Sequence, residues 1–264
     1  MTLYLREEFA AAWRGRDPFA EVDALQGEIY RNVKGRRTLQ FEFAGRAYFA
    51  KIHHGIGWGE ILKNLLTLRL PILGAKNEWQ AIARLSQLGV ATMTAAAYGS
   101  RGWNPARRAS FIITEALQDT ISLEDYCARW VQQPPPLSRK WRLIAALAGI
   151  SRTLHQHGIC HRDYYLCHFL LHEQAGFEAG AAPRLSLIDL HRALIDEHLS
   201  RRWVLKDVAG LYFSALHVGL SRHDFLRFVK QYSGKTLRAA LTEDAGFWNA
   251  VQNKALQLDR KINH

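Results

Sequence analysis

Residues 159–171 read Ile-Cys-His-Arg-Asp-Tyr-Tyr-Leu-Cys-His-Phe-Leu-Leu, and residues 185–190 read Leu-Ser-Leu-Ile-Asp-Leu. Our prediction of the fold starts from these two segments. Asp163 follows a short apolar turn, and Asp189 ends an apolar strand. Burying a carboxylate in such a setting is costly unless something charged is bound beside it. The pattern predicts two acidic groups that face a charged ligand, although either residue alone is also compatible with a loop cap.

The order His161-Arg162-Asp163 followed by Asp189 is the layout of a kinase catalytic centre. In such a centre one carboxylate orients the attacking hydroxyl and accepts its proton, while another holds the Mg²⁺ that bridges the nucleotide phosphates. We therefore predict that Asp163 is catalytic, that Arg162 and His161 brace its loop, and that Asp189 is a metal ligand. His168 stands where kinases have a second, asparagine ligand. We keep it as a candidate ligand, although imidazole suits Mg²⁺ poorly.

Upstream residues alternate between apolar and polar at period two, which predicts three antiparallel strands near 29–33, 38–43 and 47–52. Lys51 sits inside the third strand, where a lysine needs an anionic partner. Glu78 opens an amphipathic helix over 77–88 and is the predicted partner. The pair would hold the α- and β-phosphates of ATP. The alternative for Glu78 is stabilisation by the helix macrodipole alone.

The hairpin between the first two of these strands holds Gly35, Arg36 and Arg37, at the place where kinases cover the phosphates with a glycine-rich loop. One glycine is a weak motif. The two arginines could supply charge to the phosphates, or they could simply be solvated. Further on, strands near 91–98 and 110–115 complete a sheet of about five. The second strand leads through Glu115 to Leu117, the expected hinge that binds adenine through backbone groups.

The remainder of the chain is predicted to be mainly helical, with helices over 123–131, 139–157, 208–218 and within 221–264. Residues 1–27 indicate a short strand and two helical turns, with Asp17 and Pro18 as N-cap and first helical residue. Asp207, at the head of the 208–218 helix, is predicted to brace the catalytic loop. It follows Asp189 by only eighteen positions. That interval is too short for a peptide-docking segment, so we expect a small or glycan acceptor.

Composition narrows the class of protein. The chain has 264 residues, 48% of them hydrophobic, which is ample for a buried core. Three cysteines, at 127, 160 and 167, indicate free thiols in a reducing compartment. The N-terminal segment lacks the apolar run of a signal peptide, so we expect a cytoplasmic protein. A formal net charge of +11 favours anionic partners without choosing among them.

The chain resembles the lipopolysaccharide core heptose kinases nearly end to end. The strings that carry the resemblance are Lys51-Ile52-His53, Gly55-Ile56-Gly57-Trp58-Gly59-Glu60, Lys63-Asn64-Leu65-Leu66, Pro71-Ile72-Leu73-Gly74-Ala75, Glu78-Trp79 and Ile188-Asp189-Leu190-His191-Arg192. The resemblance implies an α+β, bilobal protein-kinase-like fold. Its N-lobe, 1–117, would hold a mainly antiparallel sheet, and its C-lobe, 118–264, would be helical. It also implies ATP and Mg²⁺ as cofactors, an inner-core heptose as acceptor, and acyl carrier protein as a partner.

Residues 55–75 form an insert between Lys51 and Glu78, with leucines and a tryptophan at helical spacing and lysines and an arginine nearby. Such a segment suits a membrane surface or a lipid substrate. We therefore expect a peripheral protein at the cytoplasmic face of the inner membrane. The alternative is a helix packed on the sheet, since leucine stripes at this spacing are usually core.

Other patterns in the sequence suggest other functions. The Cys160-His161 and Cys167-His168 pairs suggest zinc, but their spacing is weak support. A pseudokinase could use the basic surface to bind an acidic partner, yet it would not need Lys51, Glu78, Asp163 and Asp189 together. A kinase of the antibiotic-phosphotransferase type would not need the 55–75 insert. We expect no nucleic-acid partner, because no recognition motif of that class is present.

Overall fold

The computed structural model describes residues 1–33, 35–55, 57–66, 74–173 and 182–263. Their contacts divide the chain into two compact units, which are described separately. Unit 1 contains residues 1–84, 93–117 and 190–192, and unit 2 contains residues 85–92, 118–189 and 193–264. The fold class is α+β, as expected, with an antiparallel sheet in the N-terminal part and helices in the C-terminal part.

Unit 1 is built on a six-stranded antiparallel sheet of order β1-β5-β6-β4-β3-β2. The predicted strands at its centre are confirmed, and the sixth strand is the N-terminal one, because β1 pairs with β5. The second-last predicted strand starts at residue 95 rather than 91. The strands are β1 (Thr2–Leu5), β2 (Glu28–Val33), β3 (Arg36–Phe43), β4 (Arg46–His53), β5 (Ala95–Arg101) and β6 (Ala109–Glu115).

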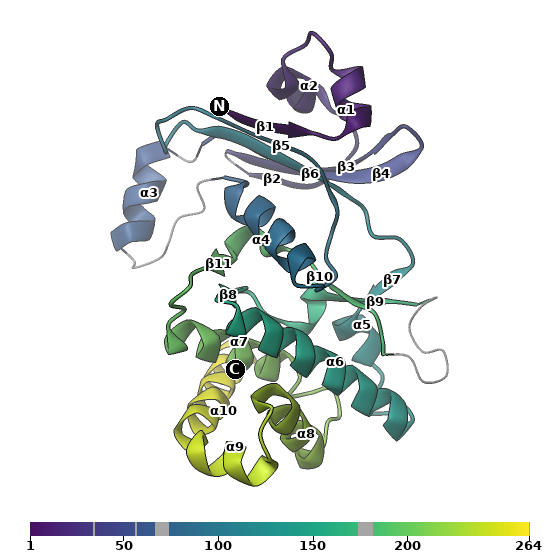
Figure 1. Cartoon of the computed structure of the whole chain (residues 1–264), viewed down its shortest axis with the longest axis vertical. Helices are drawn as coiled ribbons and strands as arrows, with labels where there is room; N and C mark the ends of the chain where they lie inside the picture. Colours follow the sequence, from purple (N-terminus) through teal and green to yellow (C-terminus); the bar gives the residue numbers. More distant parts are fainter. Residues whose placement is uncertain (34, 56, 67–73, 174–181, 264) are drawn as a thin grey trace. The chain divides into compact units, whose positions relative to one another are not determined.

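The two faces of this sheet are covered by different helices (Figure 1). Helices α1 (Glu7–Ala12) and α2 (Pro18–Ala24) lie on one face, over a core that includes Phe9, Phe41 and Ile52. Asp17 caps α2 as predicted, because its carboxylate accepts a hydrogen bond from the backbone N–H of residue 19 at 3.1 Å. Helix α4 (Lys76–Gln87) lies on the other face. Its Trp79 stacks on Tyr98 of β5, with ring centroids 5.0 Å apart.

Helix α3 (Gly57–Leu66) follows β4 and forms the described part of the insert. Residues 67–73 of the insert and residues 174–181 of the polar turn before Asp189 lie outside the described part of the chain. Across the described residues, no helix combines the length and the apolar composition needed to span a bilayer.

Unit 2 is mainly helical, and its small strands flank the loop that contains Asp163. Helix α7 packs against α10, and α6 packs against α8. The elements after residue 118 are β7 (Thr120–Ser122), α5 (Leu123–Cys127), α6 (Leu137–Gln156), β8 (Ile159–Cys160), η1 (Leu166–His168), β9 (Phe169–His172), β10 (Leu185–Leu187), η2 (Leu190–Arg192), β11 (Leu194–Ile195), α7 (Arg201–Ser214), α8 (Arg222–Ser233), α9 (Leu237–Glu243) and α10 (Ala245–Asn263), and of these η2 belongs to unit 1.

Two helix predictions in this unit were wrong in extent. The helix predicted over 123–131 ends at Cys127, and turns follow it. The helix predicted over 208–218 begins seven residues earlier, at Arg201, with Ser200 as its N-cap. Asp207 therefore lies midway along α7 rather than at its head. The apolar run from Val208 marks only the buried half of the helix, because the residues before it carry the more polar, partly exposed first turns.

Candidate active site

Lys51 and Glu78 form a buried ion pair in unit 1. The Lys51 Nζ lies 2.7 Å from the Glu78 Oε1, and the Glu78 carboxylate is fully buried. On β4, Ile52 faces the core beneath α1 and α2, so Lys51 faces the opposite side of the sheet. A carboxylate this deeply buried is strongly destabilising without its partner. The structure thus confirms the predicted pairing of Lys51 with Glu78, which lie 27 positions apart in the sequence.

The register of β3 and β4 places the side chains of Arg36 and Arg37 on opposite faces of the sheet. Arg36 pairs with His53, two residues from Lys51, and so shares its face, whereas Arg37 pairs with Ile52 on the core face. The Arg37 guanidinium donates to the carbonyl oxygens of Val22, Asp23 and Leu25, at the end of α2, at 2.9–3.4 Å. Gly35, with φ of 80°, forms the turn that leads into β3, and its carbonyl oxygen accepts from His54 N–H. Of these two arginines, Arg36 shares the Lys51 face of the sheet and Arg37 does not.

His53 shares this face and was not singled out by sequence reasoning. It is 4% exposed, and its Nε2 atom has no hydrogen-bond partner among the described residues. Burial, with the positive charges of Arg36 and Lys51 nearby, lowers the pKa of His53 to about 3. The imidazole is therefore neutral at physiological pH. The sequence does place His53 two residues after Lys51 in a predicted strand, a spacing that puts both side chains on one face of the sheet.

Glu115 and Leu117 lie where β6 ends. The Glu115 carboxylate accepts from Arg6 at 2.8 Å and from Arg46 at 3.2 Å, so its side chain is bound within unit 1. Its backbone N–H donates to the Thr94 carbonyl oxygen. Leu117 is half-buried and follows the last residue of the strand by two positions. The structure thus places this pair where β6 ends, and their role as a hinge that binds adenine stays a prediction.

In unit 2, side chains of α7 form hydrogen bonds with the backbone of the loop that contains Asp163. One Asp207 oxygen accepts from the His161 backbone N–H at 2.6 Å, and the other accepts from the Arg162 backbone N–H at 2.8 Å. The Ser214 hydroxyl accepts from the Leu166 backbone N–H at 3.0 Å. Hydrogen bonds to a charged acceptor contribute about 1.5–3 kcal/mol each. The predicted bracing role of Asp207 is confirmed, and Ser214 is a second brace that sequence reasoning missed.

His161 ties this loop to the segment that carries Asp189. Its Nε2 lies 2.8 Å from the Ile188 carbonyl oxygen, which can only accept, so Nε2 carries the hydrogen. Its Nδ1 accepts from the Asp163 backbone N–H at 3.3 Å. Burial lowers the pKa of His161, which keeps this ring neutral. His161 is thus a brace, as predicted, and fixes the backbone on both sides of the site.

His168 lies between Asp163 and Asp189. Its Nδ1 donates to the Asp163 carbonyl oxygen at 2.6 Å, and its Nε2 lies 3.8 Å from an Asp189 carboxylate oxygen. The His168 ring also stacks on His161, with centroids 5.5 Å apart. Asp189 itself has φ of 58°, in the left-handed region, which costs a non-glycine residue about 1–2 kcal/mol. Such strain is concentrated at functional sites.

Arg162 also has a left-handed backbone, with φ of 72°, and its guanidinium lies 4.9 Å from the ring centroid of Trp203 on α7. The Arg162 side chain therefore points from the loop toward α7. Helix α7 comes close enough to the loop that a Cβ at Gly210 would lie 3.0 Å from the Tyr164 carbonyl oxygen. The loop and α7 form one closely packed assembly.

The donor set near Asp189 suits Mg²⁺ better than zinc. The Asp189 carboxylate, about one third exposed, offers oxygen atoms, which Mg²⁺ prefers. The Cys160 thiol is buried and donates to the Trp203 carbonyl oxygen at 3.5 Å, and burial raises the pKa of Cys160. A cysteine binds zinc as the thiolate, which burial of Cys160 disfavours. Among the described residues, no group of three His, Cys, Asp or Glu side chains is arranged to hold a metal ion.

The antiparallel sheet with a buried lysine–glutamate pair, and the braced His-Arg-Asp loop beside a second aspartate, define a phosphotransferase of the protein-kinase-like class. Comparison with known proteins narrows this class. The model of the lipopolysaccharide kinase (Kdo/WaaP) family matches residues 20–232. The chain belongs to this family.

Relatives of known name match over almost the whole length. The lipopolysaccharide core heptose(I) kinase WaaP of Pseudomonas aeruginosa is 53% identical, over 98% of this chain and 96% of its own. The enzyme of the same name from Escherichia coli strain K12 is 50% identical, over 97% of each chain. A solved structure of WaaP in complex with acyl carrier protein is 47% identical with a TM-score of 0.86, covering 98% of this chain and 99% of its own. The chain is therefore a kinase.

Proposed function

We propose that this kinase transfers the γ-phosphate of ATP to a hydroxyl group of a heptose in the lipopolysaccharide inner core, a step in outer-membrane biogenesis. The names of relatives about half identical over the whole chain support the heptose acceptor. One structural observation carries the proposal. Asp207 holds the loop that carries Asp163, and His168 of this loop binds the Asp163 backbone carbonyl and lies 3.8 Å from an Asp189 carboxylate oxygen. This is the arrangement that phosphoryl transfer requires, because positioning and charge stabilisation supply nearly all of its catalysis.

Each unit supplies different groups. In unit 1, Glu78 holds Lys51 for the α- and β-phosphates, Arg36 adds a cation on the same face, and backbone groups from Glu115 to Leu117 bind adenine. Gly35 lies at the phosphate-covering hairpin. In unit 2, Asp163 orients the acceptor hydroxyl and takes its proton. We assign residues 1–117 and 118–264 to a nucleotide-binding lobe and a catalytic lobe. The Arg37 guanidinium is hydrogen-bonded to the end of α2, and we propose that it holds the hairpin in place and does not bind phosphate.

The carboxylate of Asp189 would hold Mg²⁺ together with phosphate oxygens of the nucleotide. When bound, this ion neutralises charge on the β- and γ-phosphates. His168 is proposed to act chiefly by holding the Asp163 backbone and facing Asp189, since imidazole is a poor ligand for Mg²⁺.

The test uses the purified chain, ATP labelled at the γ-phosphate and lipopolysaccharide from a strain that lacks the endogenous kinase. We expect one phosphate on an inner-core heptose, located by mass spectrometry. Asp163→Asn should lower kcat by about 10²–10⁴ with little change in melting temperature, because it removes the base and keeps the shape. Glu243→Gln, on the exposed surface of α9, is the control. Full activity in Asp163→Asn, or no phosphate on heptose from the unmodified chain, would contradict the proposal.

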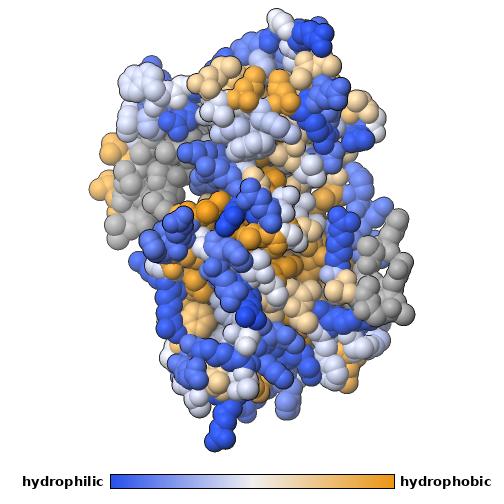
Figure 2. Space-filling model, in the orientation of Figure 1, coloured by the Kyte–Doolittle hydropathy of each residue, from blue (hydrophilic) through white to orange (hydrophobic). Residues whose placement is uncertain are grey.

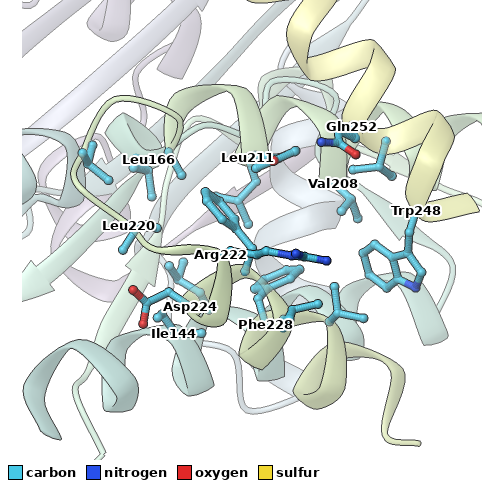
Figure 3. Close-up of a pocket in the computed structure, with 18 of the residues that line it drawn as sticks. Ile144, Leu166, Val208, Leu211, Leu220, Arg222, Asp224, Phe228, Trp248 and Gln252 are labelled. Atoms are coloured by element: carbon cyan, nitrogen blue, oxygen red, sulfur yellow. The ribbon is translucent and has the colours of Figure 1, made fainter. Parts of the chain in front are cut away.

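Acyl carrier protein is the second proposed partner. Its support is the solved complex of a 47% identical relative and an apolar cavity in unit 2. The cavity has a volume of about 590 Å³, within the range of sites for small ligands. Figure 3 shows that it lies among α6, α7, α8 and α10, with the Arg222 side chain extended toward Trp248. An acyl chain carried by that partner would fill such a space, and the charge of +11 favours an acidic protein.

The third proposed contact is the cytoplasmic face of the inner membrane, through α3. Trp58, Leu62 and Leu66 recur every four residues along this helix and are 56%, 55% and 85% exposed. Side chains at this spacing form one face. Figure 2 shows hydrophobic side chains gathered at the position of α3. An exposed apolar stripe on a chain of net positive charge suits an anionic bilayer surface.

A further inference from the structure

A cluster of four cations lies around Lys206 and Trp203, beside the catalytic loop. Lys206 Nζ lies 4.4 Å from the Trp203 ring centroid, and the Arg162 guanidinium lies 4.9 Å from it. Arg202 stands one helical turn before Lys206 on α7. Lys254 of α10 is near enough that its charge, like those of Arg202 and Arg162, lowers the pKa of Lys206, for which burial is the largest cause. These five residues are called the Trp203 cluster.

The Trp203 cluster concentrates charge at a cost to stability. Within the described part of the chain, no carboxylate lies at ion-pair distance from Arg202, Lys206 or Lys254, whereas the neighbouring Arg201 pairs with Asp244 at 3.7 Å. The first turn of α7 has no acidic residue. Cations there oppose the helix macrodipole. Contacts with the Trp203 ring offset only about 0.5–1 kcal/mol per cation at a partly exposed site. Folding alone does not explain the arrangement.

The position of the cluster relates it to the acceptor. Arg162 directly precedes Asp163, so an anion bound through Arg162 lies beside the loop that carries Asp163. In protein kinases, arginines can order a phosphorylated activation segment. The eighteen positions between Asp189 and Asp207 leave no room here for such a segment. An anionic group of the acceptor saccharide has the chemistry to occupy the cluster instead.

We propose that the Trp203 cluster binds a phosphate or carboxylate group of the acceptor saccharide and so selects an acidic glycolipid as substrate. The proposal rests on the proposed function and adds the residues that recognise the acceptor's charge. Arg202 is exposed and the other four residues are half-buried, so the cations can reach a ligand while their stems stay fixed. Guanidinium and ammonium groups are the usual partners of phosphate and carboxylate.

The experiment compares steady-state kinetics of the full chain with the Arg202→Gln/Lys206→Ala variant. The KM for the lipopolysaccharide acceptor should rise at least tenfold, while the KM for ATP changes less than twofold. Lys230→Ala/Arg238→Ala removes two exposed cations on α8 and α9 and is the charge-matched control, with no change expected in either KM. The Arg202→Gln variant alone should raise the acceptor KM severalfold. Because Arg202 is exposed, this single variant shows the effect even if the double variant folds poorly.

Two further acceptors identify the anion. A dephosphorylated acceptor and a carboxyl-reduced acceptor are each tested with the unmodified chain and the double variant. The acceptor that lacks the recognised group should give the same KM with both proteins. An unchanged acceptor KM in the double variant and in Arg202→Gln, or an equal rise in the control, would overturn the inference. Loss of heptose phosphorylation by the unmodified chain would instead refute the proposed function, so the two failures are distinguishable.

Discussion

His168 shows how one substitution in a catalytic motif can keep the geometry and change the chemistry. An asparagine at this place would offer an oxygen to Mg²⁺, whereas the imidazole donates to the Asp163 carbonyl oxygen and faces Asp189. The ring therefore lies between the Asp163 backbone and the Asp189 carboxylate. We propose that His168 is a positioning residue and that Asp189 would be the protein's chief ligand for Mg²⁺.

His53 gives unit 1 a pH-dependent stability. Its pKa is about 3 in the folded chain and about 6.5 when unfolded, so the unfolded state binds more protons between these values. Stability contributed by the neutral ring is therefore complete above pH 6.5 and falls as the pH drops, by up to about 1.4 kcal/mol per pH unit.

We predict that His53→Gln reduces the loss of stability between pH 6.5 and pH 5 by up to about 2 kcal/mol, because a neutral side chain cannot bind the proton. Chemical denaturation at pH 7.5, 6.5 and 5 measures the effect. The exposed His223, replaced by Gln, is the control and should leave the pH dependence as it is. The same acid sensitivity in His53→Gln and the unmodified chain would show that His53 is not the group that titrates.

Helix α3 is the element whose sequence pattern had two interpretations, a packed helix or a surface for membranes. Trp58, Leu62 and Leu66 are more than half exposed, which favours the second. Each leucine that enters an apolar medium contributes about 1.5–3 kcal/mol. The helix is short, with ten residues, so it would lie on the bilayer surface.

We predict that Leu62→Asp/Leu66→Asp lowers co-sedimentation with vesicles of phosphatidylglycerol and phosphatidylethanolamine at least tenfold, because both apolar contacts are lost. Kinase activity on a soluble, truncated acceptor should be retained. Val131→Asp/Leu137→Asp changes two exposed apolar residues elsewhere and is the matched control. If both double variants sediment with vesicles as the unmodified chain does, α3 does not bind the membrane.

The cavity in unit 2 is a property of the whole set of C-terminal helices. Its lining includes Ile144 of α6, Leu211 of α7, Phe228 of α8 and Val251 of α10. An unfilled apolar cavity costs stability in proportion to its volume. A ligand that fills it should stabilise the folded chain by mass action.

We therefore predict that acyl carrier protein with a long acyl chain raises the melting temperature of the kinase more than the same protein without the chain. Leu220→Trp, at the loop between α7 and α8 that lines the cavity, should reduce the difference by filling part of the space. Differential scanning fluorimetry measures both effects. Equal stabilisation by the acylated and unacylated partners would argue that the cavity does not receive the chain.

Local pattern was sufficient for most elements and for the pairing of Lys51 with Glu78. Period-two alternation located β2, β3 and β4, and a lysine within the last of them required a carboxylate, which Glu78 supplies. The start of α7 was misplaced because apolar residues concentrate in its buried half. Arg36 and Arg37 were indistinguishable by pattern, since only the pairing of β3 with β4 and the end of α2 separate their faces.

The sequence by itself determined the order of the elements, the family resemblance and the residues of the phosphotransfer motif, because periodicity and motif spacing are encoded by neighbours along the chain. Tertiary structure alone decided that Ser214 is a second brace of the loop, that Arg162 and Lys206 lie over the Trp203 ring, and that an apolar cavity opens among the C-terminal helices. These features join residues tens of positions apart. Their geometry depends on how helices and loops pack, which no local pattern specifies.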